Sequence, residues 1–359
     1  MSVYNGPQIV TSGLIAAIDA SNIKSMMGTG PERIQSTYSS FNNWNGLVGT
    51  SGSYVSKTGK TGLTITITNS NGGGVNWWNS NHSVTACTPS VPYIVTARVR
   101  WQTNTPNPNL FYIRQYNSSG SQISEYGIFS SSNVVDLGDG FYFTWAYFTT
   151  GSTAASFIVQ GYDYSNISIW LEDVQCKRAG LEDLVAATYS APMFGTMTWS
   201  PNNGGKLSYS AGNNLQITNL NLASSSYTVV SAARYTGGTR GRIVNGINNN
   251  WLIGHWGTTT ENYYAEGWVS GVAAGASDTT WRIHAATWNT GTDSASLYVN
   301  GNLVAGPNAN ASAGPNGIGI GTNGEYSDAE FSFVYAYNRV LTDAEIQTIF
   351  YAERARFGI

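Results

Sequence analysis

The sequence has few charged residues and no basic run. Only 10% of its 359 residues are Asp, Glu, Lys or Arg, whereas about 25% is usual for soluble domains. The formal net charge is −3, and no segment concentrates Lys or Arg into the cationic stripe with which nucleic-acid-binding proteins contact phosphates. We therefore expect no nucleic-acid partner.

Long apolar segments and cysteine motifs are also missing. The apolar runs are far shorter than the ~20 residues that span a bilayer, and the N-terminus shows neither the basic nor the apolar region of a signal peptide. We therefore expect a protein made in a cytoplasm, with no membrane partner. Cys87 and Cys176 are the only cysteines. Two cysteines without a CxxC pair predict no zinc site, and whether they pair or stay buried thiols is open.

Residue combinations typical of hydrolases are absent from the sequence. A glycoside hydrolase needs two carboxylates about 5–9.5 Å apart across a cleft, which on a strand would give an E-x-D-x-E run because residues two apart share a face. Asp328 and Glu330 have that spacing but stand alone beside a turn, and His82, His255 and His284 are scattered. We expect no enzymatic activity, no catalytic or metal-binding residue and no cofactor.

Residues that favour strands and turns are abundant. Aromatic residues make up 13% of the chain, and 41 glycines accompany many Asn, Ser and Thr residues. This composition favours strands joined by tight turns, and alternating segments such as "YIVTARVRW" (93–101) indicate half-buried strands. Several such segments between about Thr37 and Gln175, and a second set from Lys206 onward, predict an all-β protein with two β-sandwich, jelly-roll domains.

Two local motifs in the second set are specific. Asn300-Gly301 lies between two apolar runs, and this dipeptide is typical of a two-residue type I′ hairpin turn. Near the C-terminus, an expected strand at residues 331–337 is followed by one short helix, for which Thr342 and Glu345 have the spacing of a capping box. An apolar stripe follows the capping box. We expect this helix to cover an apolar patch of the sandwich.

The C-terminal half carries a likeness to a known family. "YNRVLTDAEIQ", preceded by "SLYVNGNLVAG" and "GIGIG", resembles the C-terminal signature of laminin-G-like, concanavalin A-like jelly-roll domains that are common in bacteriophage structural proteins. "NNWLIGHWG" and "YYAEGWVSG" are similar to that subgroup as well. The resemblance implies a lectin-like sandwich in this half of the chain and a place in a virion, and it leaves a structural calcium ion open as an alternative to the absence of any cofactor.

The segment "GLIAAIDASN" (13–22) has the pattern of one strand, which needs a sheet. A segment similar to "YNGPQIVTSGLIAAIDASNIKSMMGTG" opens the resembling domains, and here its expected continuation, "LEDLVAATYSAPMFGTMTW", begins only at Leu181. We therefore expect residues 1–33 and 180–359 to form one discontinuous jelly roll, with residues 34–179 inserted as a second sandwich. "SSFNNW", "DGFYFTWAYFTT" and "ISIWLEDVQ" make the insert similar to carbohydrate-binding-module jelly rolls.

Aromatic residues are the candidate binding residues, since sugar rings stack on exposed aromatic faces while Asn and Ser bond their hydroxyls. Trp77 and Trp78 stand among small polar residues in "GGGVNWWNSN". Four further candidates lie on expected strands, where filling of the sandwich or a protein contact competes with sugar binding: Trp251, Trp256, Tyr263 and Tyr264. Glycan binding and protein contact both stay open for these residues.

The resemblance implies a non-enzymatic virion structural protein, and we expect an exposed decoration protein of the head or tail. Its expected partners are other virion proteins, further copies of itself in a homo-oligomer, and host surface glycans. A receptor-binding tail fibre or spike is the first alternative, and a polysaccharide-active enzyme or lectin is the second. The expected location is the virion surface.

Overall fold

The structure of the protein is a computed structural model, which describes residues 9–22, 54–57, 65–68, 85–101, 111–127, 133–161, 169–186, 188–201, 204–270, 278–322 and 324–359. The chain forms two compact units. Unit 1 comprises Met1–Met26 and Gly180–Ile359, and unit 2 comprises Met27–Ala179, so that unit 2 interrupts unit 1 in the sequence.

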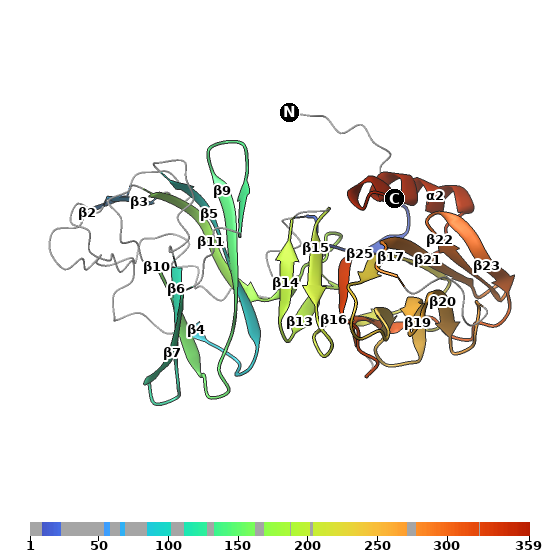
Figure 1. Cartoon of the computed structure of the whole chain (residues 1–359), viewed down its shortest axis with the longest axis horizontal. Helices are drawn as coiled ribbons and strands as arrows, with labels where there is room; N and C mark the ends of the chain where they lie inside the picture. Colours follow the sequence, from blue (N-terminus) through green and yellow to red (C-terminus); the bar gives the residue numbers. More distant parts are fainter. Residues whose placement is uncertain are drawn as a thin grey trace. The chain divides into compact units, whose positions relative to one another are not determined.

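Unit 1 contains two antiparallel sheets (Figure 1). Its eight-stranded sheet consists of β1 (Leu14–Asp19), β14 (Met197–Ser200), β15 (Lys206–Tyr209), β17 (Tyr227–Tyr235), β21 (Arg282–Asn289), β22 (Ser294–Val299), β23 (Asn302–Asn308) and β25 (Ala329–Tyr337). Its seven-stranded sheet consists of β12 (Gly180–Leu181), β13 (Ala191–Phe194), β16 (Asn214–Asn221), β18 (Val244–Gly246), β19 (Trp251–Trp256), β20 (Thr259–Ala265) and β24 (Asn316–Ile320).

The order of the strands brings distant segments together. The first sheet runs β14–β15–β25–β17–β21–β22–β23, with β1 also paired to β25, and the second runs β12–β13–β16–β24–β18–β19–β20. Rings of the two sheets meet between them: Tyr227 of β17 contacts Trp251 of β19 at a centroid distance of 6.3 Å. The two sheets therefore enclose the core of a β-sandwich.

The N-terminal strand β1 pairs with β25, with Ala17 opposite Tyr335. Asp183, which follows unit 2 in the sequence, holds the same strand: its Oδ1 accepts a hydrogen bond of 2.9 Å from the backbone N–H of Ala17. The indole N–H of Trp199 donates to the carbonyl of Ala20 over 2.6 Å. The segments that flank unit 2 in the sequence are thus bound to each other within unit 1.

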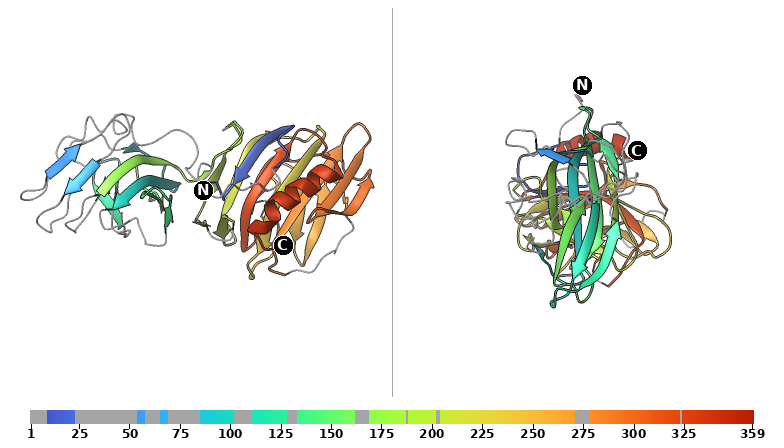
Figure 2. Two further views of the ribbon diagram at one scale, coloured as in Figure 1. Left: turned by 90° about the horizontal axis from the view of Figure 1, so that it is seen from above. Right: turned by 90° about the vertical axis from the view of Figure 1, so that its left-hand side faces the viewer.

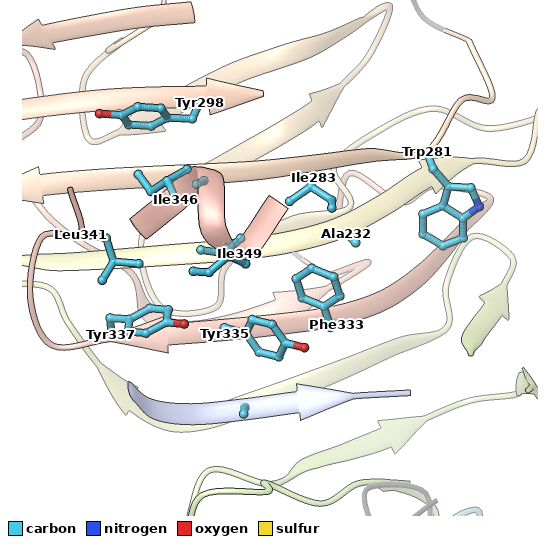
Figure 3. Packing of buried hydrophobic residues seen from close by; sticks show 13 residues of the cluster. Ala232, Trp281, Ile283, Tyr298, Phe333, Tyr335, Tyr337, Leu341, Ile346 and Ile349 are labelled. Atoms are coloured by element: carbon cyan, nitrogen blue, oxygen red, sulfur yellow. The ribbon is translucent and has the colours of Figure 1, made fainter. Parts of the chain in front are cut away.

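Helix α2 (Asp343–Glu353) covers the face of the eight-stranded sheet that points away from the seven-stranded one (Figure 2). The predicted capping box is confirmed, because Thr342 accepts from the backbone of Glu345 and the Glu345 carboxylate accepts from the backbone of Thr342. Ile346 and Ile349 point into a cluster of buried sheet residues that includes Phe333 (Figure 3). Burial of this apolar stripe fixes the helix on the sheet.

The predicted Asn300-Gly301 hairpin turn is also present. The two residues have positive φ angles of 49° and 78° and join β22 to β23. The short helical turn η2 (Arg354–Arg356) follows α2 and ends near the C-terminus.

Unit 2 has a six-stranded and a four-stranded sheet. The six-stranded sheet has the order β2 (Tyr54–Lys57), β3 (Ile65–Thr68), β11 (Ile169–Arg178), β5 (Pro92–Trp101), β9 (Tyr142–Thr149) and β8 (Val134–Asp136). The four-stranded sheet has the order β4 (Thr85–Ala86), β10 (Ser156–Gly161), β6 (Phe111–Tyr116) and β7 (Gln122–Gly127). Tyr93 and Phe148 of the larger sheet pack against Phe157 of the smaller one, at centroid distances of 5.3 and 5.1 Å.

The predicted fold class, β-sandwich sheets with one short helix near the C-terminus, is confirmed for the residues that the structure describes. Cys87 and Cys176 are not joined by a disulfide. None of the described helices has the length and apolar composition needed to cross a bilayer.

Candidate functional site

Two of the six candidate aromatic residues belong to the core of unit 1. Trp251 and Tyr263 are fully buried, and both hydrogen-bond the hydroxyl of Tyr227, at 2.8 Å from the indole N–H and 2.6 Å between the hydroxyls. Rings without an exposed face cannot stack on a ligand, so the prediction that Trp251 and Tyr263 bind a sugar is wrong. Trp77 and Trp78 lie outside the described residues.

Trp256 and Tyr264 lie on the opposite side of the seven-stranded sheet and are half-buried. Both contact Trp268, with ring centroids 5.2 Å apart for Trp256 and 5.0 Å apart for Tyr264. Trp268 reaches them because the chain turns back after β20 and forms a single bridge with Tyr264. We call these three residues the aromatic cluster.

Trp268 was not among the candidate residues. In "YYAEGWVSG" its large ring stands next to Gly267 and close to Ser270. Trp77 has similar small neighbours, and this pattern could have identified Trp268. The backbone of Gly267 approaches Asn310 so closely that a side chain there would overlap its carbonyl. The absence of a side chain at Gly267 thus allows Asn310 to lie close to the chain next to Trp268.

A polar pocket adjoins the aromatic cluster. The indole N–H of Trp256 donates to Glu325 Oε1 over 3.1 Å, and the other oxygen of Glu325 forms an ion pair with Arg242. Arg242 also donates to Asn250 Oδ1 over 2.7 Å. Arg242, Asn250 and Glu325 line a cavity of about 410 Å³ together with Ile247, Asn248 and Asn249. We call this cavity the asparagine pocket.

The asparagine pocket is close to electrically neutral, and one of its amide side chains is fixed by hydrogen bonds. Asn249 is held at both ends of its amide, since its Nδ2 donates to the carbonyl of Gly314 over 2.8 Å and its Oδ1 accepts from the backbone of Asn316 over 2.9 Å. The charge of Arg242 is balanced by Glu325. A ligand there would meet amide side chains next to Glu325, the residue that Trp256 contacts.

The acidic residues singled out from the sequence have structural partners. Asp328 accepts hydrogen bonds from the backbone of Thr239 and Ala211, which lower its pKa. Burial raises the pKa of Glu330, but ion pairs with Lys206 and Arg234 outweigh burial and hold the pKa below its ordinary value. A general acid of a glycosidase needs a raised pKa, and neither group has one.

Two of the three histidines are buried together between the sheets. His255 of β19 and His284 of β21 contact each other with ring centroids 5.1 Å apart. Burial lowers the pKa of both, that of His284 to about 4. Both are therefore neutral near pH 7 and face no solvent, and His82 lies outside the described residues.

No group of three or more His, Cys, Asp or Glu side chains that could hold a metal ion occurs in the part of the chain that the structure describes. Two of the acidic side chains described above form ion pairs instead. Glu325 pairs with Arg242, and Glu330 pairs with Lys206 and Arg234.

A protein-family model matches part of unit 1. Residues 209–347 match the concanavalin A-like lectin/glucanases superfamily. The match spans the strands from the end of β15 to β25 and the first part of helix α2, and it includes the whole aromatic cluster and asparagine pocket. No curated protein matches this chain.

Several solved structures have a similar fold over about half of the chain. Domain 4 of the extracellular arabinanase AbnA from Geobacillus stearothermophilus, solved with arabinotriose, aligns with a TM-score of 0.39 and 13% identity, over 48% of this chain and 92% of that one. The binding domain of Paraclostridial mosquitocidal protein 1 aligns with a TM-score of 0.36 and 14% identity, over 47% and 49%. The binding domain of botulinum neurotoxin serotype G gives 0.32 and 14%, over 48% of each chain. The chain thus spans about half of these toxin binding domains.

Proposed function

We propose that this protein is a non-catalytic, lectin-like binding protein whose unit 1 binds a glycan at the aromatic cluster and the adjoining asparagine pocket. The observation that carries the proposal is the chain of contacts from Trp268 to Trp256 to Glu325, which joins two half-buried rings to a residue that lines a pocket of amides. The match of residues 209–347 to a superfamily that contains lectins supports the class of ligand.

The chemistry of the surface suits a sugar. The faces of a pyranose or furanose ring are apolar C–H surfaces that stack on aromatic rings, and their hydroxyls need amides and carboxylates as partners. Trp256 is fixed by its hydrogen bond to Glu325, so its ring does not need to be ordered when a ligand binds. Such preorganisation favours affinity, because the entropy of ordering a side chain is not lost on binding.

The balanced charge of the pocket favours uncharged sugars. The guanidinium of Arg242 donates to Asn250 and pairs with Glu325, which leaves little attraction for a carboxylate or sulfate group. Neutral oligosaccharides are therefore the expected ligand class.

A glycan array with the full chain tests this proposal. We expect neutral oligosaccharides to bind, and Trp256→Ala and Trp268→Ala to weaken binding about tenfold or more, which corresponds to about 1.4 kcal/mol. Tyr351→Ala is the matched control, because Tyr351 is an aromatic residue on helix α2 with 53% of its surface exposed and should leave binding unchanged. Absence of binding to every glycan, or equal binding by all variants, would contradict the proposal.

Trp77→Ala and Trp78→Ala belong in the same experiment. A loss of binding confined to these two variants would move the glycan site to unit 2 and leave the aromatic cluster without this role. Release of reducing ends from a polysaccharide by the purified protein would instead favour the enzyme alternative.

For the biological setting, we propose an exposed decoration protein on the surface of a bacteriophage particle, associated with other virion proteins and with further copies of itself. The support is the resemblance of "YNRVLTDAEIQ" and "SLYVNGNLVAG" to virion jelly-roll domains. A tail fibre or spike that binds host glycans would use the same aromatic cluster. Mass spectrometry of purified virions tests the setting, and absence of the chain from particles would contradict it.

A further inference from the structure

A second cavity in unit 1 lies where β14, β15, β17 and β25 meet their loops. Its volume is about 570 Å³, within the range of about 300–1,000 Å³ that is usual for small-ligand sites. Five Ser and Thr side chains line it: Thr196, Thr198, Ser208, Ser210 and Thr236. None of the three residues of the aromatic cluster lines it. We call it the hydroxyl pocket.

Two polar side chains frame the hydroxyl pocket, and both are fixed by the backbone. Asn213 Oδ1 accepts from the N–H of Thr196 over 2.7 Å, and its Nδ2 donates to the carbonyl of Ser210 over 3.1 Å. Asp328 accepts from Ala211 over 2.9 Å with Oδ1 and from Thr239 over 2.7 Å with Oδ2. The polar groups of the pocket are therefore set in place without a ligand.

Glycines make these two anchorages possible. Gly195 has a φ of 81°, and a Cβ atom there would overlap Oδ1 of Asn213. Gly238 has a φ of 62°, and a Cβ atom there would overlap Oδ2 of Asp328. The side chains of Asn213 and Asp328 thus lie against backbone at positions where a residue with a Cβ atom would not fit.

The charge of the lining limits the ligand class. Among the described residues that line the pocket, Asp328 is the one charged side chain. Lys206 and Arg234, which lie on the neighbouring strands, are both held by Glu330 at 2.6 and 2.7 Å. An anion would meet a carboxylate without a compensating cation in the described lining, whereas a neutral hydroxylated molecule would find the hydroxyl groups of Ser and Thr as donors and acceptors.

We propose that the hydroxyl pocket is a second carbohydrate subsite of unit 1, which takes a neutral mono- or disaccharide independently of the aromatic cluster. This inference takes the class of ligand, a neutral carbohydrate, from the proposed function. The place of binding rests on the hydroxyl pocket alone. Its recognition would depend on hydrogen bonds to hydroxyls, because Tyr209, the one aromatic residue of the described lining, is only 6% exposed. Two sites on one unit would raise the avidity for a multivalent glycan surface without raising the affinity of either site.

The experiment is a titration of the full chain with maltose, cellobiose, lactose and xylobiose, followed by NMR signals of both sites. The side-chain amide of Asn213 and the backbone amides of Ala211 and Thr239 report on the hydroxyl pocket, while the indole N–H signals of Trp256 and Trp268 report on the aromatic cluster. Thr198→Leu fills the pocket and removes one hydroxyl from an exposed strand position. Thr218→Leu, at an exposed position of β16 outside the pocket, is the matched control.

We expect at least one disaccharide to shift the hydroxyl-pocket signals in the wild-type protein and in Thr218→Leu. In Thr198→Leu at least about nine-tenths of that shift should be lost, while the indole signals of this variant should respond as in the wild-type protein. Trp256→Ala should leave the hydroxyl-pocket shifts unchanged. Absence of these shifts with all four disaccharides, or their persistence in Thr198→Leu, would overturn the inference. Failure of the proposed function would appear separately, as indole signals that do not respond.

Discussion

The guanidinium of Arg356 lies 2.7 Å from one carboxylate oxygen of Asp19 and 3.1 Å from the other, although the two residues are 337 positions apart. The same guanidinium contacts Glu353 and donates to the carbonyl of Gly204 over 2.7 Å. The hydroxyl of Tyr335 lies within 3.1 Å of both acids. One cation thus joins the first strand of unit 1 to the last turn of the chain.

Removal of this cation should be strongly destabilising. Arg356→Met would leave Asp19 and Glu353, whose side chains are only 11% and 9% exposed, close together without a counter-charge. Uncompensated charges in such places cost about 3 kcal/mol of the free energy of unfolding. Urea denaturation measures this, with Arg354→Met as the control, because Arg354 is exposed on the same turn and makes ring contacts instead. Equal stability of the two variants would contradict this role of Arg356.

The pairing of β1 with β25 predicts how unit 1 responds to deletions. Replacement of residues 27–179 by a short Gly/Ser linker should leave a folded unit 1, because the bonds between Ala17 and Asp183 and between Ala20 and Trp199 remain. Deletion of residues 1–22 from that shortened chain should abolish its cooperative unfolding transition. Circular dichroism during thermal unfolding distinguishes the two forms. A shortened chain without a cooperative transition, or a stable chain without β1, would refute this interpretation of the fold.

The buried histidines make the stability of unit 1 dependent on pH. Burial lowers the pKa of His284 to about 4, below its value in the unfolded chain, so the unfolded state binds more protons at acid pH. Stability should be complete above about pH 6.5 and should fall as the pH decreases toward 4, by on the order of 3 kcal/mol for His284 alone. Urea denaturation between pH 7 and 4 measures the loss.

His255→Phe provides the comparison for this pH dependence. The Nε2 of His255 is buried without a hydrogen-bond partner, and its ring packs against Tyr235 with centroids 4.8 Å apart, so phenylalanine keeps the contact and loses no bond. The variant should be less sensitive to acid than wild type. An unchanged slope of stability against pH would show that His255 does not contribute to it.

Local motifs were predictable from the sequence because a few neighbouring residues decide them. The capping box needs only Thr342 and Glu345 at the correct spacing, and the hairpin turn needs only two residues that accept positive φ. The partner of β1 became predictable only through resemblance, since an apolar run such as Leu14–Ile18 does not encode which strand completes its hydrogen bonds.

The division of the aromatic residues between core and surface could not be predicted, for a physical reason. Alternation along β19 places Trp251 and Trp256 on opposite faces, and that much can be seen in the sequence. Leu252 and Ile253 are both 1% exposed, however, so apolar residues cover both faces of the strand. The pattern therefore does not reveal which face is the core, and the contact of Trp268 with Tyr264 depends on a turn outside the strand pattern.

This division predicts opposite behaviour for two tryptophans of unit 1. Trp251→Phe keeps a buried ring but loses the hydrogen bond to the Tyr227 hydroxyl, which should lower the free energy of unfolding by about 1–2 kcal/mol. Trp268→Ala removes a half-buried ring from the surface and should affect stability less, while the dissociation constant for a bound glycan rises about tenfold. Isothermal titration calorimetry measures the dissociation constant of both variants, and urea denaturation measures their free energy of unfolding. If Trp251→Phe weakened glycan binding as much as Trp268→Ala at equal stability, the core of the sandwich, rather than its outer face, would have to hold the ligand.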